Sequence, residues 1–431
     1  MLHGCIGLAT SRIILPAAPT FVARILLVLI SATLQISVQA QEFSVDVRSA
    51  DAARTGVAAA TNSRADEPSA WDRIADPRSE NGAIQVVPTY YGDVFNNTRG
   101  GISTNDATRY LGLLDLELRV DGERLRLPLP GKFYLLGQNT HGQGLTEHFI
   151  GDALVHSDID SFRNITQVGE YWWELGVLDD DLKVRLGKQD VNTEFVYMDS
   201  AADFVQSSFE LSPAEVIPTY PHQSMAAVAL LQLHPSLEFK LGVWDALAPV
   251  GSWGISGNGT TFIIGELEYA YALGDGALPG TAAVGIARLA EGELNGNAFD
   301  AVNGGALQLE QMVYREDADS PRDVQGLSTF LAYYPRSLGS KFLPKAFGDH
   351  FAGGLVYRGL IPHRDEDVLG AGLSWVELFQ GGSNQETVVE LFYKAQITPE
   401  LSFQPDLQYV STPSGIYRDA LVAGVRYQVA F

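Results

Sequence analysis

Apolar and polar side chains alternate through the last eleven residues of the chain. The apolar ones fall on every second position from Leu421 to Phe431, with Arg426 and Gln428 among the residues between them. A period of two predicts a β-strand with one apolar face. A strand that ends on an aromatic residue is typical of the closing strand of an outer-membrane barrel, whose apolar face meets lipid. The alternative is a β-sandwich whose last strand happens to end in Phe.

The same alternation recurs from residue 84 onward, between polar turns. This alternation gives 17 candidate strands. Because bacterial single-chain barrels have even strand numbers, we expect about 16 strands, with one candidate forming a loop or two candidates merging. The candidate strands are 84–95, 111–120, 124–137, 147–157, 167–178, 182–190, 224–234, 237–245, 260–272, 281–289, 306–315, 327–334, 350–357, 369–379, 386–397, 401–410 and 421–431.

The connections between these candidates are alternately short and long. Asp121-Gly122 is a two-residue hairpin signal, and 179–181, 235–236 and 398–400 are short polar turns on the same side of the meander. The long connections 190–223, 246–259 and 335–349 fall on the other side, and 201–211 could form a short helix that folds inward. This arrangement predicts an all-β fold, a transmembrane antiparallel β-barrel with short periplasmic turns and long outer loops.

The N-terminal region indicates export. Arg12 and Arg24 precede an apolar run that ends in Val38-Gln39-Ala40, a sequence suited to signal peptidase. We expect residues 1–40 to be a cleaved signal peptide, 41–83 a flexible periplasmic segment, and 84–431 the barrel domain. An uncleaved membrane anchor is the alternative, but the apolar run is short for a spanning helix.

Composition and motifs limit the chemistry. The chain has 29 basic and 52 acidic residues, a net charge of −23, and its one cysteine, Cys5, lies in the leader. Such acidity argues against binding nucleic acid or an anionic membrane surface. The metal-binding His-Glu-x-x-His and nucleophile Gly-x-Ser-x-Gly patterns are missing from the sequence, so we expect no catalytic residue, metal or cofactor.

Alternation also assigns charged residues to one face of several strands. If the apolar faces meet lipid, the charged faces converge inside the barrel. Carboxylates and guanidinium groups hydrogen-bond to sugar hydroxyls, and an indole ring packs against a flat sugar face. A solvated wall without selectivity explains any single residue equally well. The predicted pore-lining residues are Glu117, Arg119, Arg126, Glu170, Trp172, Glu174, Lys183 and Arg185.

Several segments resemble the carbohydrate-selective porin family of OprB type. The resemblance implies a barrel of 16 strands that passes monosaccharides, glucose among them, by passive facilitated diffusion. It also places Lys188, Asp190 and Glu194, with Arg185, in a block typical of the family, which adds them to the predicted sugar-binding residues. The segments that carry it are 91–101, 172–174, 182–195, 204–209 and, most specifically, 386–409.

We therefore expect an outer-membrane porin of a Gram-negative bacterium, surrounded by lipid, with sugars as its transported solutes. A homo-oligomer is one option for its assembly. One alternative is a general or cation-preferring diffusion porin without a sugar site. The other is a secreted all-β glycosidase or lectin, since paired carboxylates also serve glycoside hydrolysis.

Overall fold

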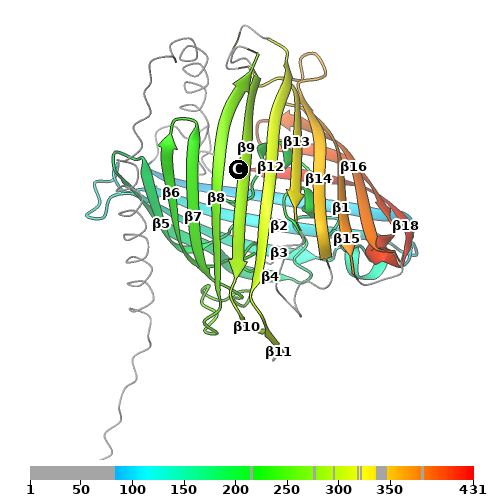
Figure 1. The fold of residues 1–431 in the computed structure, drawn as a ribbon. Coiled ribbons are helices and arrows are strands. Elements are labelled where there is room, and N and C mark those ends of the chain that lie inside the picture. The colour runs from blue at the N-terminus through cyan, green and yellow to red at the C-terminus, as the bar shows by residue number, and fades with distance from the viewer. Residues whose placement is uncertain are drawn as a thin grey trace, which may run out of the picture. The chain divides into compact units, whose positions relative to one another are not determined.

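The computed structural model describes residues 83–213, 217–274, 278–294, 297–317, 320, 323–335, 347–379 and 383–431. The predicted signal peptide 1–40 lies outside the described residues, as does the predicted periplasmic segment 41–83 apart from its last residue. In the described part of the chain, 16 antiparallel strands close into one barrel (Figure 1), which confirms the predicted fold class. No helix among these residues is long and apolar enough to cross a membrane.

Each strand of the barrel is hydrogen-bonded to two neighbours, and β1 and β18 meet to close it. A separate hairpin of β10 (Gly292–Leu294) and β11 (Asn297–Phe299) lies between β9 and β12 in the sequence. The barrel strands are β1 (Ile84–Gly101), β2 (Thr108–Asp121), β3 (Lys132–Gly142), β4 (Ile165–Val177), β5 (Leu182–Gln189), β6 (Ser224–His234), β7 (Leu237–Asp245), β8 (Thr261–Leu273), β9 (Leu278–Leu289), β12 (Val302–Arg315), β13 (Gly326–Tyr334), β14 (Phe347–Arg358), β15 (Val368–Leu378), β16 (Gln385–Thr398), β17 (Leu401–Ser411) and β18 (Arg418–Ala430).

The seam between β1 and β18 explains the pattern of the terminal strand. Their register runs from Thr89 opposite Ala430 to Gly101 opposite Arg418. The backbone N–H of Phe431 extends it by donating to the carbonyl of Pro88 at 3.0 Å. The predicted alternation is confirmed, because Arg426 is buried on the inner face while the apolar residues beside it face outward.

The connection between β2 and β3 differs from the predicted two-residue hairpin at Asp121-Gly122. It spans residues 122–131 and is closed by Gly122, whose N–H donates to the carbonyl of Gly131 at 2.8 Å. The candidate strand 124–137 is therefore wrong over its first half. Leucines alternate there as in a strand, but Pro128 and Pro130 lack the N–H groups that a central strand must donate.

The candidate strand 147–157 is also wrong, since it belongs to the β3–β4 loop. This loop holds a short π-helix, η1 (Thr146–Ile150), and its apolar side chains pack inside the barrel. The expectation that one candidate would be loop is confirmed. In the β5–β6 loop, the predicted helix 201–211 is replaced by two 3₁₀ turns, η2 (Asp199–Ala201) and η3 (Ser207–Phe209), which do lie inward.

The two inward loops make much of the inner face apolar. In one cluster, Phe204 and Phe209 of the β5–β6 loop pack against Phe330 of β13 and Phe392 of β16. A second cluster joins the β3–β4 loop to β1 and β15–β18. The condition that the apolar faces meet lipid therefore does not hold where a loop covers the wall, because a residue buried beneath a loop need not be polar.

Candidate functional site inside the barrel

The β3–β4 loop (143–164) and the β5–β6 loop (190–223) are bonded to each other inside the barrel. The N–H of Asp158 donates to the carbonyl of Val205 at 2.9 Å, and the N–H of Ser207 donates to the carbonyl of Val155 at 3.1 Å. The side-chain amide of Gln206 donates to the carbonyl of Leu154 at 2.6 Å. The two loops therefore form one joined element, which we call the inner lid.

Glutamates that point inward from the wall hold the inner lid by its backbone. A carboxylate offers two acceptor oxygens, so one side chain can satisfy two N–H groups of a loop. Glu386 and Glu390 of β16, Glu266 of β8 and Glu310 of β12 all accept from the lid backbone, Glu266 from one N–H group and the others from two. Glu386 accepts from the N–H groups of Ala153 (2.8 Å) and Leu154 (2.7 Å). Glu390 accepts from those of Val205 (2.8 Å) and Gln206 (3.0 Å). Glu266 accepts from the N–H of Val196 at 2.8 Å, and Glu310 from that of Ser200 at 2.6 Å.

Four of the sequence-predicted residues come together between β4, β5 and the inner lid. Trp172 stacks on Tyr134 with ring centroids 4.9 Å apart, and the guanidinium of Arg185 lies 4.1 Å from the Trp172 ring. Arg185 also pairs with Glu174 at 2.7 Å and with Glu194 of the lid at 2.9 Å. Trp172 is 1% exposed and Arg185 2%, so this group binds the lid to the wall and presents little surface to a solute.

Five further predicted residues lie on the same side of the interior. Glu117 and Arg119 form an ion pair on β2. Glu170 of β4 accepts from the N–H of Asp190 at 3.2 Å, and the Asp190 carboxylate accepts from the N–H of Tyr220 at 2.7 Å. Asp190, at the start of the β5–β6 loop, therefore binds both the wall and a residue near the end of the same loop. Lys183 is half-buried and shares the inward face of β5 with Arg185. It lies one residue from the start of that strand.

Two of the predicted residues are not on the inner face. Arg126 is exposed in the β2–β3 turn with φ +54°, so the prediction that it lies on an inward strand face is wrong. Lys188 is three residues from the inward Arg185 and therefore points outward. Its ammonium donates to the carbonyl of Val168 at 2.6 Å and to that of Ser252 at 3.0 Å, beneath the β7–β8 loop.

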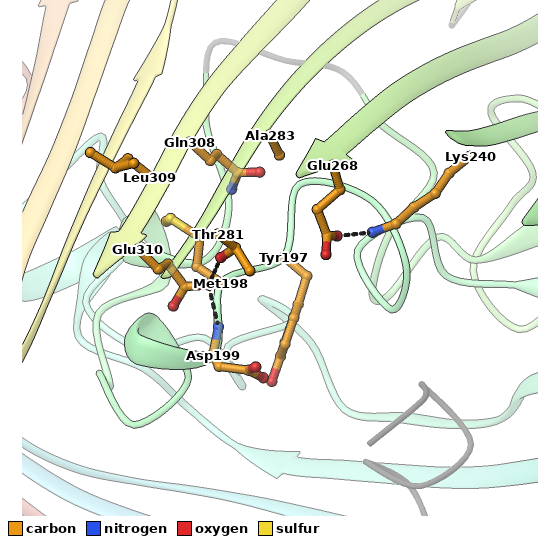
Figure 2. Close-up of a pocket in the computed structure, with 10 residues that line it drawn as sticks. All are labelled: Tyr197, Met198, Asp199, Lys240, Glu268, Thr281, Ala283, Gln308, Leu309 and Glu310. Atoms are coloured by element: carbon orange, nitrogen blue, oxygen red, sulfur yellow. Dashed lines mark hydrogen bonds and ion pairs between the residues drawn. The ribbon is translucent and has the colours of Figure 1, made fainter. Parts of the chain in front are cut away.

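A hollow that is open to solvent lies between the inner lid and the wall formed by β7, β8, β9 and β12 (Figure 2). Glu268 and Glu310 each lie five residues from the short-turn end of their strand. It is lined by Tyr197, Met198, Asp199, Lys240, Glu268, Thr281, Ala283, Gln308, Leu309 and Glu310.

Polar groups of the hollow are arranged by the wall and the lid together. Glu310 accepts from the N–H of Asp199 at 3.3 Å and from the Thr281 hydroxyl at 3.4 Å (Figure 2). Lys240 donates to Glu268 at 2.6 Å across the hollow's wall. The carboxylate of Asp199 is exposed, while the ring of Tyr197 is half-buried. The site thus offers an aromatic ring, carboxylates, an amide and a hydroxyl to one small solute.

Sequence reasoning missed the residues of this hollow, although part of the signal was present. Lys240 follows Phe239, and Glu266 and Glu268 flank Leu267, the same alternation that marked β2 and β4. Tyr197 and Asp199 lie in a loop without periodicity, so no pattern placed them at the wall. No group of three or more His, Cys, Asp or Glu within the described ranges is arranged to hold a metal ion.

A model of the carbohydrate-selective porin, OprB family, matches residues 105–431. The chain belongs to this family. Porin B of Pseudomonas aeruginosa is 22% identical over 402 residues, which cover 79% of this chain and 86% of that protein. The structure of Pseudomonas putida OprB at high pH shares the fold with a TM-score of 0.70 at 19% identity, covering 81% of this chain and 94% of the other.

The low-pH structure of Pseudomonas putida OprB matches with a TM-score of 0.53 at 18% identity, covering 81% of this chain and 93% of that one. Family and fold together identify an outer-membrane β-barrel porin. They indicate a channel rather than an enzyme. The predicted family, fold and outer-membrane location are therefore confirmed.

Proposed function

We propose that this porin passes monosaccharides such as glucose by passive, facilitated diffusion. The observation that carries the proposal is the hollow beside the inner lid. A solute that crosses the barrel must pass the lid, and the hollow lies between the lid and the wall. Its mixture of polar and aromatic groups suits one sugar ring.

The chemistry of the lining suits a sugar more than an apolar solute. Sugar hydroxyls can donate to Asp199 and Glu268 and can accept from the amide of Gln308. The ring of Tyr197 can pack against the apolar face of a pyranose. These contacts are few and partly solvated, so the sugar binds weakly and leaves readily, as passive conduction requires.

The remaining predicted residues support this function indirectly. Trp172, Glu174, Arg185 and Glu194 fix the position of the inner lid and so set the width of the path. Lys183, Glu117 and Arg119 would line the path nearer the short-turn end. We also propose that residues 1–40 direct export and that the exposed apolar side chains of the outer face, such as Ile286 and Leu355, contact lipid.

Radiolabelled glucose uptake into proteoliposomes tests the proposal. We expect uptake faster than into protein-free vesicles, and we expect Tyr197→Ala to slow it. Tyr269→Ala is the matched control, because Tyr269 is 51% exposed on the outer face of β8. Uptake equal to that of protein-free vesicles would refute a sugar channel.

A general, cation-preferring porin is the second candidate, favoured by the excess of carboxylates in the hollow. Single-channel current separates the two. A sugar that rests in the hollow reduces ion current while bound, whereas a general porin lets glucose pass without measurable block. Dose-dependent block by glucose, weakened by Tyr197→Ala, supports the sugar site.

A further inference from the structure

We infer that the hollow discriminates among sugars by charge, admitting neutral and amino sugars and disfavouring acidic sugars, and that Asp199 is a specificity-determining residue. The inference rests on the proposed function, because it concerns which sugars that same path accepts. It draws on the fixed charges around the hollow and on what each charged group already binds.

The lining of the hollow is acidic. Asp199, Glu268 and Glu310 contribute carboxylates, and Lys240 contributes the one ammonium of the lining residues. Glu266 lies behind Lys240 and adds another carboxylate at 3.1 Å from its nitrogen. A solute in the hollow therefore meets an excess of negative charge.

The ammonium of Lys240 has no donor left for an acidic solute. An ammonium group has three N–H donors. Those of Lys240 bind the carbonyl of Glu194 at 2.9 Å, the carboxylate of Glu266 at 3.1 Å and that of Glu268 at 2.6 Å. A sugar carboxylate in the hollow would thus lie near other carboxylates without a hydrogen bond from the Lys240 ammonium. It would also lose hydration.

Four inward cations elsewhere in the described part of the barrel are committed in the same way. Salt bridges engage each of them with at least one carboxylate of the wall or the inner lid, which lowers their attraction for an anion. These pairs are Arg119 with Glu117, Arg185 with Glu174 and Glu194, Lys394 with Asp203 at 2.6 Å, and Arg426 with Asp93 and Asp158.

An amino sugar meets the opposite situation. Its ammonium can donate to the exposed carboxylate of Asp199, whose own backbone N–H is already held by Glu310. The attraction is stronger than in bulk water because the hollow is partly enclosed by low-dielectric walls. Asp199 can lose its charge without losing the backbone contact that positions it, which makes it the informative position to change.

Tracer uptake of glucose, glucosamine and glucuronate by the reconstituted full-length protein tests the inference. We expect glucosamine to enter faster than glucuronate at low ionic strength, with a smaller ratio at high salt. Asp199→Asn should reduce the glucosamine-to-glucuronate ratio about twofold to fivefold. Asp106→Asn is the matched control, since Asp106 is exposed in the β1–β2 turn at φ +50°, a conformation that Asn also tolerates.

The outcomes separate this inference from the proposed function. If glucose enters no faster than into protein-free vesicles, the proposed function fails. If glucose enters but glucuronate matches glucosamine, the sugar channel is retained and the charge discrimination is overturned. If the ratio is present but unchanged in Asp199→Asn, the assignment to Asp199 is overturned.

Discussion

Glu386 and Glu390 lie on the same inward face of β16, and each holds a different loop of the inner lid. Glu386 accepts from the N–H groups of Ala153 and Leu154 in the β3–β4 loop. Glu390 accepts from two N–H groups of the β5–β6 loop, one on each carboxylate oxygen. A single strand therefore fixes both loops, and its two glutamates set how far the lid extends across the barrel.

Glu390→Gln should loosen the inner lid. An amide has one acceptor oxygen, so one of the two loop N–H groups would face an NH₂ donor. The loss of a charge-assisted hydrogen bond costs about 1.5–3 kcal/mol. We expect larger and noisier single-channel currents and faster cleavage of residues 190–223 by added protease.

Glu123→Gln is the control for this change, because Glu123 is exposed in the β2–β3 turn and its backbone alone makes a hydrogen bond there. It should leave current and cleavage unaltered. A Glu390→Gln porin with the wild-type current and the wild-type protease pattern would contradict the anchoring role.

Trp172 provides a test between a structural role and direct contact with sugar. Its ring lies between Tyr134 and Arg185 and is 1% exposed, so Trp172→Ala should cost about 3–5 kcal/mol of stability. Trp253→Ala should cost little, since Trp253 is 69% exposed. The temperature at which the detergent-solubilised barrel changes its mobility on a gel measures both.

Trp172→Phe distinguishes the two roles further. It keeps an apolar ring against Tyr134, so glucose uptake should stay near the wild-type rate if Trp172 only holds the lid. A marked loss of glucose uptake at unchanged thermal stability would instead support the sugar contact that the sequence suggests.

The sequence was sufficient for the barrel and for most of its strands. Apolar and polar residues alternate along a barrel strand with a strict period of two. This alternation located β18 from residue 421 onward and the ion-paired face of β2. It failed at 124–131, where leucines alternate around prolines, and at 147–157, where apolar side chains face the interior. Period alone does not reveal which side of the wall an apolar face meets.

The candidate site was less predictable than the fold. Local alternation brought Trp172, Glu174 and Arg185 to one face correctly, and Glu194 joined them through the lid. It could not reveal that the lid covers them, because the path of the β5–β6 loop depends on Glu266, Glu310 and Glu390, which are 70 or more residues away in sequence. Lys188 was misplaced because family resemblance gives a block of residues and not a face.

Acid should weaken the β3–β4 loop through His156. Burial lowers the pKa of His156 to about 4, so the folded loop keeps the ring neutral while the unfolded loop titrates near 6.5. The neutral His156 ring therefore contributes its full stabilisation of the folded loop above pH 6.5. As the pH falls toward 4, this contribution to the free energy of folding is lost, by about 3 kcal/mol at most. Burial also raises the pKa of Asp158 and Asp160, whose effects have the opposite sign.

His156→Asn isolates this contribution, because Asn does not titrate in the range. We expect the acid-induced change in channel current between pH 6.5 and 4 to be smaller in His156→Asn than in the wild type. His363→Asn, at an exposed turn residue with φ +66°, should retain the full change. Equal pH profiles for His156→Asn and the wild type would exclude His156 as the source.

Arg426 should be among the most sensitive positions of the barrel, because it joins the closing seam to the inner lid. It pairs with Asp93 across the seam at 2.8 Å and with Asp158 of the β3–β4 loop. Arg426→Met leaves two carboxylates without their cation in a buried setting, which costs about 3–5 kcal/mol. Urea-induced unfolding of the detergent-solubilised protein should shift to lower urea accordingly.

Matched variants separate loss of the pair from loss of the side chain. Arg288→Met should have little effect, since Arg288 is exposed on the outer face and bonds only to Asn303 at 2.9 Å among the contacts described. Adding Asp93→Asn to Arg426→Met should recover part of the stability, because it removes one of the two carboxylate charges left without a cation. If Arg426→Met unfolds at the same urea concentration as Arg288→Met, the seam does not depend on this ion pair, and closure rests on the backbone ladder between β1 and β18 alone.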